Sequence, residues 1–266
     1  MTSISEAFEN CRTQSRKALI PYLTAGFPKG ELFVTLLKEF IEAGVDLLEV
    51  GIPFSDPLAD GRSIQYSSQK ALENGINIEK TFEFLDAWDK IHKIPLILMS
   101  YYNLILSYGV SRFAKKAKQT GVSGLIIPDM IPEEGGLVER FCQRNELDLI
   151  YLLAPTSNSQ RRKRIIKSSR GFVYLVSVTG VTGERKKLPT YLNSWIRQVK
   201  KESELPVCVG FGISNPQQAK SIAQVADGVI VGSAIIEIIR NQTSSRQIVQ
   251  KTKKFIHDLR ERMNNE

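Results

Sequence analysis

The chain has 266 residues, of which 42% are hydrophobic and 24% are charged, and its 36 lysines and arginines against 28 aspartates and glutamates give a net charge of +8. These fractions are ordinary for a globular protein and exclude a disordered tail, a collagen-like repeat and a small disulfide scaffold. The positive charges form short clusters without interleaved aromatic residues, which indicates solvated helix faces and no nucleic-acid interface.

No apolar run approaches the roughly 18 residues that a membrane span requires, and the start of the chain lacks the layout of a secretory signal. We therefore expect a cytoplasmic protein without a membrane segment. The three cysteines, Cys11, Cys142 and Cys208, lie far apart in the sequence and far from both histidines. This spacing predicts reduced structural cysteines and no metal site.

In chain order, Ile4, Phe8 and Cys11 predict a short helix capped by Ser3 or Ser5. Short apolar runs then alternate with segments of helical periodicity. The expected strands are residues 19–25, 47–51, 96–101, 124–128, 149–154, 172–177, 207–210 and 228–231. The expected helices include residues 31–43, 79–91, 110–120, 134–144, 159–167, 191–200, 216–225 and 246–262.

Strands that alternate with helices predict a parallel sheet, because parallel neighbours need a crossover connection. Eight such units in about 250 residues match a closed (β/α)8 TIM barrel, here an α/β fold with an extra N-terminal helix and a single domain over residues 1–266. An open doubly wound sheet is the main alternative. It is disfavoured because no GxGxxG motif follows the first strand.

Active sites of such barrels lie at the carboxyl ends of the strands. Glu49 lies in the second expected strand and shares a face with Leu47 and Gly51. Burial of this strand on both faces would raise the pKa of Glu49 and make it a usable acid or base near neutral pH. Alternatively, Glu49 reaches water or a lysine. The next loop carries Asp56 and Asp60, each either a turn residue or a second active-site carboxylate.

Three glycine-bearing turns predict a phosphate site: residues 179–183 after the sixth strand, Gly210 to Gly212 after the seventh, and Gly232 with Ser233 after the eighth. Glycine allows backbone amides to approach a phosphate, and barrels often bind phosphate beside strands seven and eight. Ser233 could instead simply cap a helix. The polar segment 178–189 is either a surface loop or a lid over the site. The residues Tyr22, Met99, Tyr101, Tyr174 and Phe211 would by default be packing residues.

The segment 48–61, Leu-Glu-Val-Gly-Ile-Pro-Phe-Ser-Asp-Pro-Leu-Ala-Asp-Gly, resembles the signature of the tryptophan synthase alpha chain family. Similar stretches cover essentially the whole chain, at residues 21–26, 99–103, 128–129, 174–177, 180–183, 210–214 and 232–235. The resemblance implies a lyase of tryptophan biosynthesis that cleaves indole-3-glycerol phosphate to indole and glyceraldehyde 3-phosphate by a reverse aldol reaction. It also implies a beta-chain partner in an alpha2beta2 complex. That partner would carry the pyridoxal phosphate, so the alpha chain itself would need no cofactor.

By the same resemblance, Glu49 is the catalytic acid and base, and Asp60 binds the indole N–H. Tyr174 would lie beside the substrate, with Tyr22, Met99, Tyr101 and Phe211 as further substrate-binding residues. Gly183, Gly212, Gly232 and Ser233 would hold the phosphate. The chain departs from the family at Arg62, where proline is usual, and at Phe27, where an acidic residue is usual.

Two other readings remain at this point. The chain could be another phosphate-handling barrel, such as an isomerase or synthase, or a catalytically idle subunit that activates a beta chain. The presence of both Glu49 and Asp60 argues against an idle subunit. The sequence does not show whether the chain turns over without the beta chain, how strongly the two chains activate each other, or whether the segment 178–189 closes on substrate.

Overall fold

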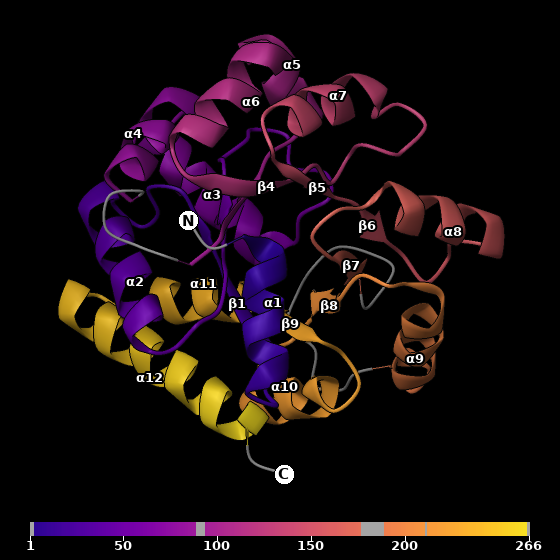
Figure 1. The fold of residues 1–266 in the computed structure, drawn as a ribbon. Coiled ribbons are helices and arrows are strands. Elements are labelled where there is room, and N and C mark those ends of the chain that lie inside the picture. The colour runs from indigo at the N-terminus through magenta and orange to yellow at the C-terminus, as the bar shows by residue number, and fades with distance from the viewer. Residues whose placement is uncertain (1–2, 89–93, 177–188, 211, 265–266) are drawn as a thin grey trace.

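The computed structural model describes residues 3–88, 94–176, 189–210 and 212–264. Parallel strands form the centre and helices surround them, with α1 (Ile4–Thr13) across the front of the strands in Figure 1. The described strands are β1 (Ala18–Thr24), β2 (Leu48–Gly51), β3 (Leu96–Met99), β4 (Val122–Ile126), β5 (Asp148–Ile150), β6 (Leu152–Leu153), β7 (Val173–Val176), β8 (Val207–Gly210) and β9 (Gly228–Val231).

The described strands follow one another around the sheet in the order β5-β4-β3-β2-β1-β9-β8-β7-β6. The first and last strands of this series, β5 and β6, are neighbours in the chain, so the sheet forms a nearly closed barrel. Tyr22 of β1 pairs with Glu49 of β2, and Ala18 of β1 pairs with Gly228 of β9, which joins the beginning of the sheet to its end. The predicted (β/α)8 barrel is confirmed, and the open doubly wound sheet is excluded.

The strand expected at residues 149–154 is divided in two at Tyr151, so the described residues contain nine strands where eight were expected. The Tyr151 side chain is buried, and its hydroxyl donates a hydrogen bond of 2.8 Å to Glu139 Oε1 of α7 (Gly136–Arg144). The same hydroxyl lies so close to Gly135 that a Cβ there would be 1.9 Å from it. This tyrosine therefore packs against α7 at the point where the strand breaks.

The other helices are α2 (Gly30–Glu42), α3 (Arg62–Glu73), α4 (Ile78–Trp88), α5 (Tyr102–Tyr108), α6 (Val110–Gln119), α8 (Ser159–Ser168), α9 (Leu192–Glu202), α10 (Pro216–Ala223), α11 (Ser233–Arg240) and α12 (Ser245–Asn264). Most of them pack their apolar faces on the strands, whereas α12 packs on α2, α10 and α11. No described helix is both long and apolar enough to cross a membrane. The sequence did not predict α3, because serines (Ser63, Ser67 and Ser68) take much of its buried face and weaken the apolar periodicity.

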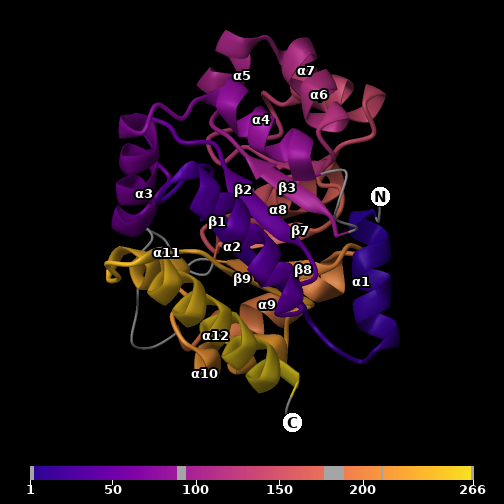
Figure 2. The same cartoon turned by 90° about the vertical axis from the view of Figure 1, so that its left-hand side faces the viewer.

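The first helix closes the end of the barrel from which the strands begin. Ser3 caps it as expected: Ser3 Oγ accepts from the Glu6 N–H at 3.1 Å, and Glu6 Oε2 accepts from the Ser3 N–H at 2.6 Å. Ile4 is fully buried against Gly124 of β4, where a Cβ would lie 2.8 Å from Ile4 Cδ1. Figure 2 shows α1 on one side of the strands and α3 on the opposite side.

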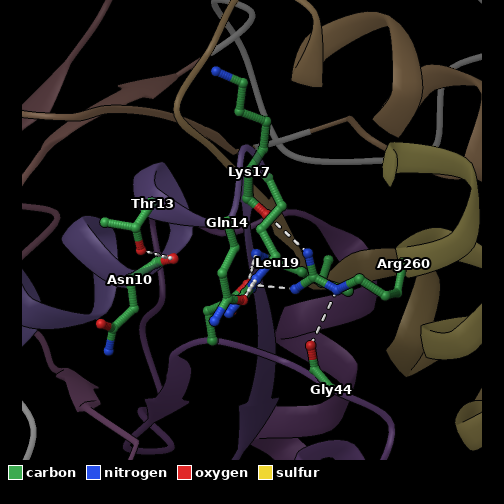
Figure 3. Close-up of polar contacts among 9 residues, drawn as sticks. Asn10, Thr13, Gln14, Lys17, Leu19, Gly44 and Arg260 are labelled. Carbon is green, nitrogen blue, oxygen red and sulfur yellow. Dashed lines mark hydrogen bonds and ion pairs between the residues drawn. The ribbon is translucent and has the colours of Figure 1, made fainter. Parts of the chain in front are cut away.

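A buried ion cluster at this end ties the last helix to the first strands. The Asp46 carboxylate lies just before β2 and forms ion pairs with Arg16 and with Arg260 of α12. It also accepts a hydrogen bond of 2.8 Å from the Leu19 N–H. Arg260 further donates to the carbonyls of Lys17 (2.8 Å) and Gly44 (3.1 Å), as Figure 3 shows. Both carboxylate oxygens thus have charged partners, which a buried carboxylate requires.

Candidate active site

A cavity opens at the other end of the barrel, where the strands end. About 420 Å³ of atom-free space lies there, part of it open to solvent. The side chains and turns around it come from β1, β2, β3, β7 and β9 and from the segments that follow β2, β8 and β9. Its lining residues are Tyr22, Glu49, Asp60, Ile64, Met99, Tyr174, Gly212, Ile213, Ile230, Gly232 and Ser233.

Glu49 projects from the middle of β2 into this cavity and is 1% exposed. Burial, and to a lesser degree the nearby charge of Asp60, raises the pKa of Glu49 to about 8. Glu49 Oε2 has no hydrogen-bond partner in the described part of the chain. At neutral pH the side chain therefore holds a proton, and its Oε2 atom has no bond to any of the residues that the structure describes.

Asp60 lies two residues before α3 and is 4% exposed. Burial raises its pKa to about 7, and a hydrogen bond from Tyr101 opposes this rise. The Tyr101 hydroxyl donates to Asp60 Oδ2 at 3.0 Å and accepts from the Ala59 N–H at 3.1 Å. Tyr101 therefore bonds the backbone of the loop before α3 and also favours the ionised form of Asp60.

The two carboxyl groups differ in their readiness to ionise. Asp60 has a hydrogen-bond donor for its carboxylate, whereas Glu49 has none among the described residues. Asp60 therefore loses its proton first, and its negative charge then helps to keep the proton on Glu49. A protonated acid beside an ionised carboxylate is the arrangement that acid–base catalysis uses.

Two tyrosines and several apolar side chains wall the cavity. Tyr22 of β1 lies over Gly51 of β2, and Tyr174 of β7 lies over Gly210 of β8 in the same way. A Cβ at Gly51 would be 2.1 Å from the Tyr22 hydroxyl, and one at Gly210 would be 2.2 Å from the Tyr174 hydroxyl. Glycine at each of these two positions leaves room for the tyrosine ring of the adjacent strand.

Gly212, Gly232 and Ser233 line the same cavity as the two carboxyl groups. Gly232 caps α11, Ser233 is its first residue, and no acidic side chain lies in the first turn. Gly212 follows β8 with φ of +83°, a conformation that favours glycine. The free N–H groups and the positive end of the helix dipole make such a helix start a binding site for a phosphate.

The cavity brings together eight of the residues singled out from the sequence: Tyr22, Glu49, Asp60, Met99, Tyr174, Gly212, Gly232 and Ser233. Tyr101 does not line it but bonds Asp60. Gly183, Phe211 and most of the segment 178–189 fall outside the described residues. Of the two departures, Phe27 is buried against the Tyr66 ring, with ring centroids 6.0 Å apart, and Arg62 is exposed at the first position of α3.

Sequence reasoning missed Ile64, Ile213 and Ile230, because an apolar residue at a cavity has the same sequence pattern as one in the core. It also missed a chain of hydroxyl groups from Tyr22 through Thr24 to Ser67. Within the described chain, the one group of side chains with metal-ligand spacing is His257, Asp258 and Glu261 on α12. None of these three lines the cavity.

The chain is similar to known proteins over its whole length. A family model described as tryptophan synthase alpha chain matches residues 8–264. The tryptophan synthase alpha chain of Dehalococcoides mccartyi is 44% identical over 261 residues, which cover 98% of this chain and 99% of that relative. The tryptophan synthase alpha chain of Methanocaldococcus jannaschii is 40% identical over 253 residues, which cover 95% and 90% of the two chains.

Solved structures agree with these relatives. Tryptophan synthase subunit alpha from Legionella pneumophila superposes with a TM-score of 0.91 at 36% identity and covers 100% of both chains. A chain of Mycobacterium tuberculosis tryptophan synthase superposes with a TM-score of 0.90 at 35% identity, again over 100% of both chains.

Proposed function

The chain belongs to the tryptophan synthase alpha chain family, and we propose that its cavity cleaves indole-3-glycerol phosphate to indole and glyceraldehyde 3-phosphate. The observation that carries this proposal is the pairing of Glu49 and Asp60 in one buried cavity that also contains the start of α11. Two carboxyl groups with different ionisation supply acid–base chemistry, and the helix start supplies a phosphate site.

Glu49 is the acid and then the base. Its proton goes to the indole ring carbon that bears the side chain, which leaves a positive charge on the ring. The bond from this carbon to the hydroxyl-bearing carbon then breaks, and its electron pair returns to the ring. The hydroxyl proton passes to the Glu49 carboxylate as the aldehyde forms, so Glu49 ends with the proton it began with. A pKa of about 8 suits both steps near neutral pH.

Asp60 binds the indole N–H and stabilises the positive ring charge in the transition state. Its ionised form, which the Tyr101 hydroxyl favours, is the one that does so. Tyr22, Met99 and Tyr174 contact the indole ring, as does Phe211. Gly183, Gly212, Gly232 and Ser233 hold the phosphate through backbone amides, with the Ser233 hydroxyl as a further donor.

The family implies a beta-chain partner, which receives the indole and carries pyridoxal phosphate, so the alpha chain works without a cofactor of its own. We place the alpha2beta2 complex in the cytoplasm. Two exposed leucines support a docking surface: Leu58 is 88% exposed in the loop after β2, and Leu106 of α5, which follows β3, is 46% exposed. β2 and β3 are adjacent in the barrel, and Tyr101 ties the Leu58 loop to Asp60.

Glu49→Gln tests the assignment. Single-turnover cleavage of indole-3-glycerol phosphate should fall by a factor of about 10³ or more, because the variant has no proton to transfer. Substrate binding and the unfolding transition should persist. Glu83→Gln, which removes an exposed carboxylate of α4, is the matched control and should cleave normally. Near-normal cleavage by Glu49→Gln would contradict the role given to this residue.

A further inference from the structure

Three buried hydroxyl groups connect the cavity to the interior of α3. The Tyr22 hydroxyl lies 3.2 Å from Thr24 Oγ1, and Thr24 Oγ1 lies 2.6 Å from Ser67 Oγ. Ser67 Oγ in turn lies 2.9 Å from the Ile64 carbonyl oxygen. Thr24 and Ser67 are fully buried, so this hydroxyl chain does not exchange its bonds with bulk water.

One set of directions satisfies all three bonds of the hydroxyl chain at once. The Ile64 carbonyl only accepts, so when every bond is made Ser67 donates its single proton to it. Ser67 Oγ is then the acceptor for Thr24, and Thr24 Oγ1 is the acceptor for Tyr22. The Tyr22 proton consequently points along β1 toward Thr24, and the cavity side of the Tyr22 hydroxyl presents only lone pairs.

Tyr22 lies on the strand next to the one that carries the catalytic acid. Tyr22 and Glu49 are register partners on β1 and β2, and the Tyr22 hydroxyl fills the space above Gly51, on the face of β2 that Glu49 shares. Glu49 Oε2 has no partner among the described residues. Tyr22 and Glu49 both line the cavity, so a bound ligand meets an acceptor oxygen and a protonated carboxyl within it.

We propose that Tyr22 determines specificity for a hydroxyl-bearing substrate: its oxygen accepts a hydrogen bond from a glycerol hydroxyl beside Glu49, and Thr24 and Ser67 are positioning residues that keep the Tyr22 proton out of the cavity. This inference rests on the proposed function, because it names the substrate of the same site. A site with an oriented acceptor rejects an analogue that lacks the matching hydroxyl, since the acceptor would be left unpaired.

The test compares two ligands that differ only in the two free hydroxyl groups of the three-carbon chain: indole-3-glycerol phosphate and the same phosphate ester with an unsubstituted propyl chain. Affinities are measured in the inactive Glu49→Gln background by calorimetry. Tyr22→Phe should weaken binding of the glycerol ester about 2- to 12-fold, the range for one hydrogen bond between neutral groups, and leave the propyl ester unchanged. Thr24→Val should reduce the same discrimination, because its Tyr22 is free to turn its proton into the cavity. Thr24→Ser should restore it.

Tyr108→Phe is the matched control, because it removes a tyrosine hydroxyl that bonds Glu79 away from the cavity. Equal losses for both ligands in Tyr22→Phe or Thr24→Val would indicate general damage to the pocket and overturn the inference. An unchanged ratio of affinities would overturn it as well. Cleavage by the chain with Glu49 intact is measured in parallel: if it is absent, the proposed function fails, and the inference falls with it.

Discussion

The Tyr22 side chain fills the space above Gly51, at the carboxyl ends of β1 and β2. A Cβ on Gly51 would lie 2.1 Å from the Tyr22 hydroxyl oxygen and 2.7 Å from the ring carbon that bears it. The same side chain packs closely on Gly232, where an added Cβ would lie 3.2 Å from the Tyr22 Cβ. Tyr22 thus packs between the strand that carries Glu49 and the turn that begins α11.

Gly51→Ala should therefore destabilise the protein by about 1–3 kcal/mol, the usual effect of overpacking a core. Urea unfolding measures this loss. A second change, Tyr22→Leu, should recover most of the lost stability, because the shorter leucine side chain does not reach the position of the new Cβ. Gly136→Ala is the control, since a Cβ there meets nothing within 4 Å. Equal stabilities of Gly51→Ala and Gly136→Ala would show that the ring moves freely.

Stability should depend on pH through Glu49. Its folded-state pKa of about 8 lies above the ordinary 4.5, so the folded protein binds more protons than the unfolded chain between these values. The free energy of unfolding therefore decreases as pH rises from about 4.5 to about 8. Glu49→Gln removes this loss. The variant should match the wild type near pH 4 and melt several degrees higher at pH 9, as calorimetric scans would reveal. A constant difference in Tm across this range would contradict the raised pKa.

Tyr101→Phe should move the pH dependence of cleavage. The Tyr101 hydrogen bond lowers the pKa of Asp60 against the effect of burial, so its removal raises the Asp60 pKa above about 7. If the Asp60 carboxylate is the active form, the acidic limb of kcat/KM shifts upward by about one pH unit, the equivalent of a bond of about 1.4 kcal/mol. Tyr108→Phe should leave the limb in place. A lower kcat/KM with no shift would assign Tyr101 to packing alone.

The ion cluster around Asp46 predicts a stability effect far from the cavity. Arg260→Ala removes one of its two cationic partners and should lower the free energy of unfolding by about 3 kcal/mol, the lower end for breaking a buried pair, because Arg16 remains. Arg262→Ala, an exposed arginine of the same helix, should change it by no more than about 0.5 kcal/mol. Chemical denaturation of both variants provides the comparison.

Leu58→Asp should weaken association with the beta chain. The side chain is 88% exposed, so the isolated alpha chain should fold and cleave substrate as before, while a charge on a buried interface would remain unpaired. Titration of a beta chain in a calorimeter or an ultracentrifuge gives the affinity. Gln247→Asp adds the same charge to an exposed position of α12. If both variants bind equally well, Leu58 lies outside the interface.

The barrel itself could be predicted because its signals are local. Most of the strands are short and largely apolar, and helices such as α2 place Phe33, Leu36, Leu37 and Phe40 on one buried face. The position of Glu49 followed from the same logic, since strand alternation assigned it a face. Local sequence patterns thus predicted both the fold and the position of one carboxyl group of the cavity.

What escaped prediction depends on contacts between distant segments. Ser67 reads as a polar surface residue of a helix, yet it is buried because Thr24, 43 residues earlier, supplies a partner. The fifth expected strand is divided at Tyr151, whose hydroxyl bonds Glu139 on α7, 12 residues earlier in the chain. Asp46 and Arg260 are each unremarkable charged residues in the sequence, and only the folded chain brings them together.

The Asp46–Arg260 pair also bears on how this chain is made. The two residues are 214 positions apart, so the ribosome delivers the carboxylate long before its guanidinium partner. Throughout that interval the early strands have Arg16 alone to neutralise an acid that the finished barrel buries. Nascent chains should therefore remain sensitive to protease near Asp46 until α12 has been synthesised. A chain that ends before α12 would leave the ribosome without the ion pair that connects β1 and β2 to the last helix.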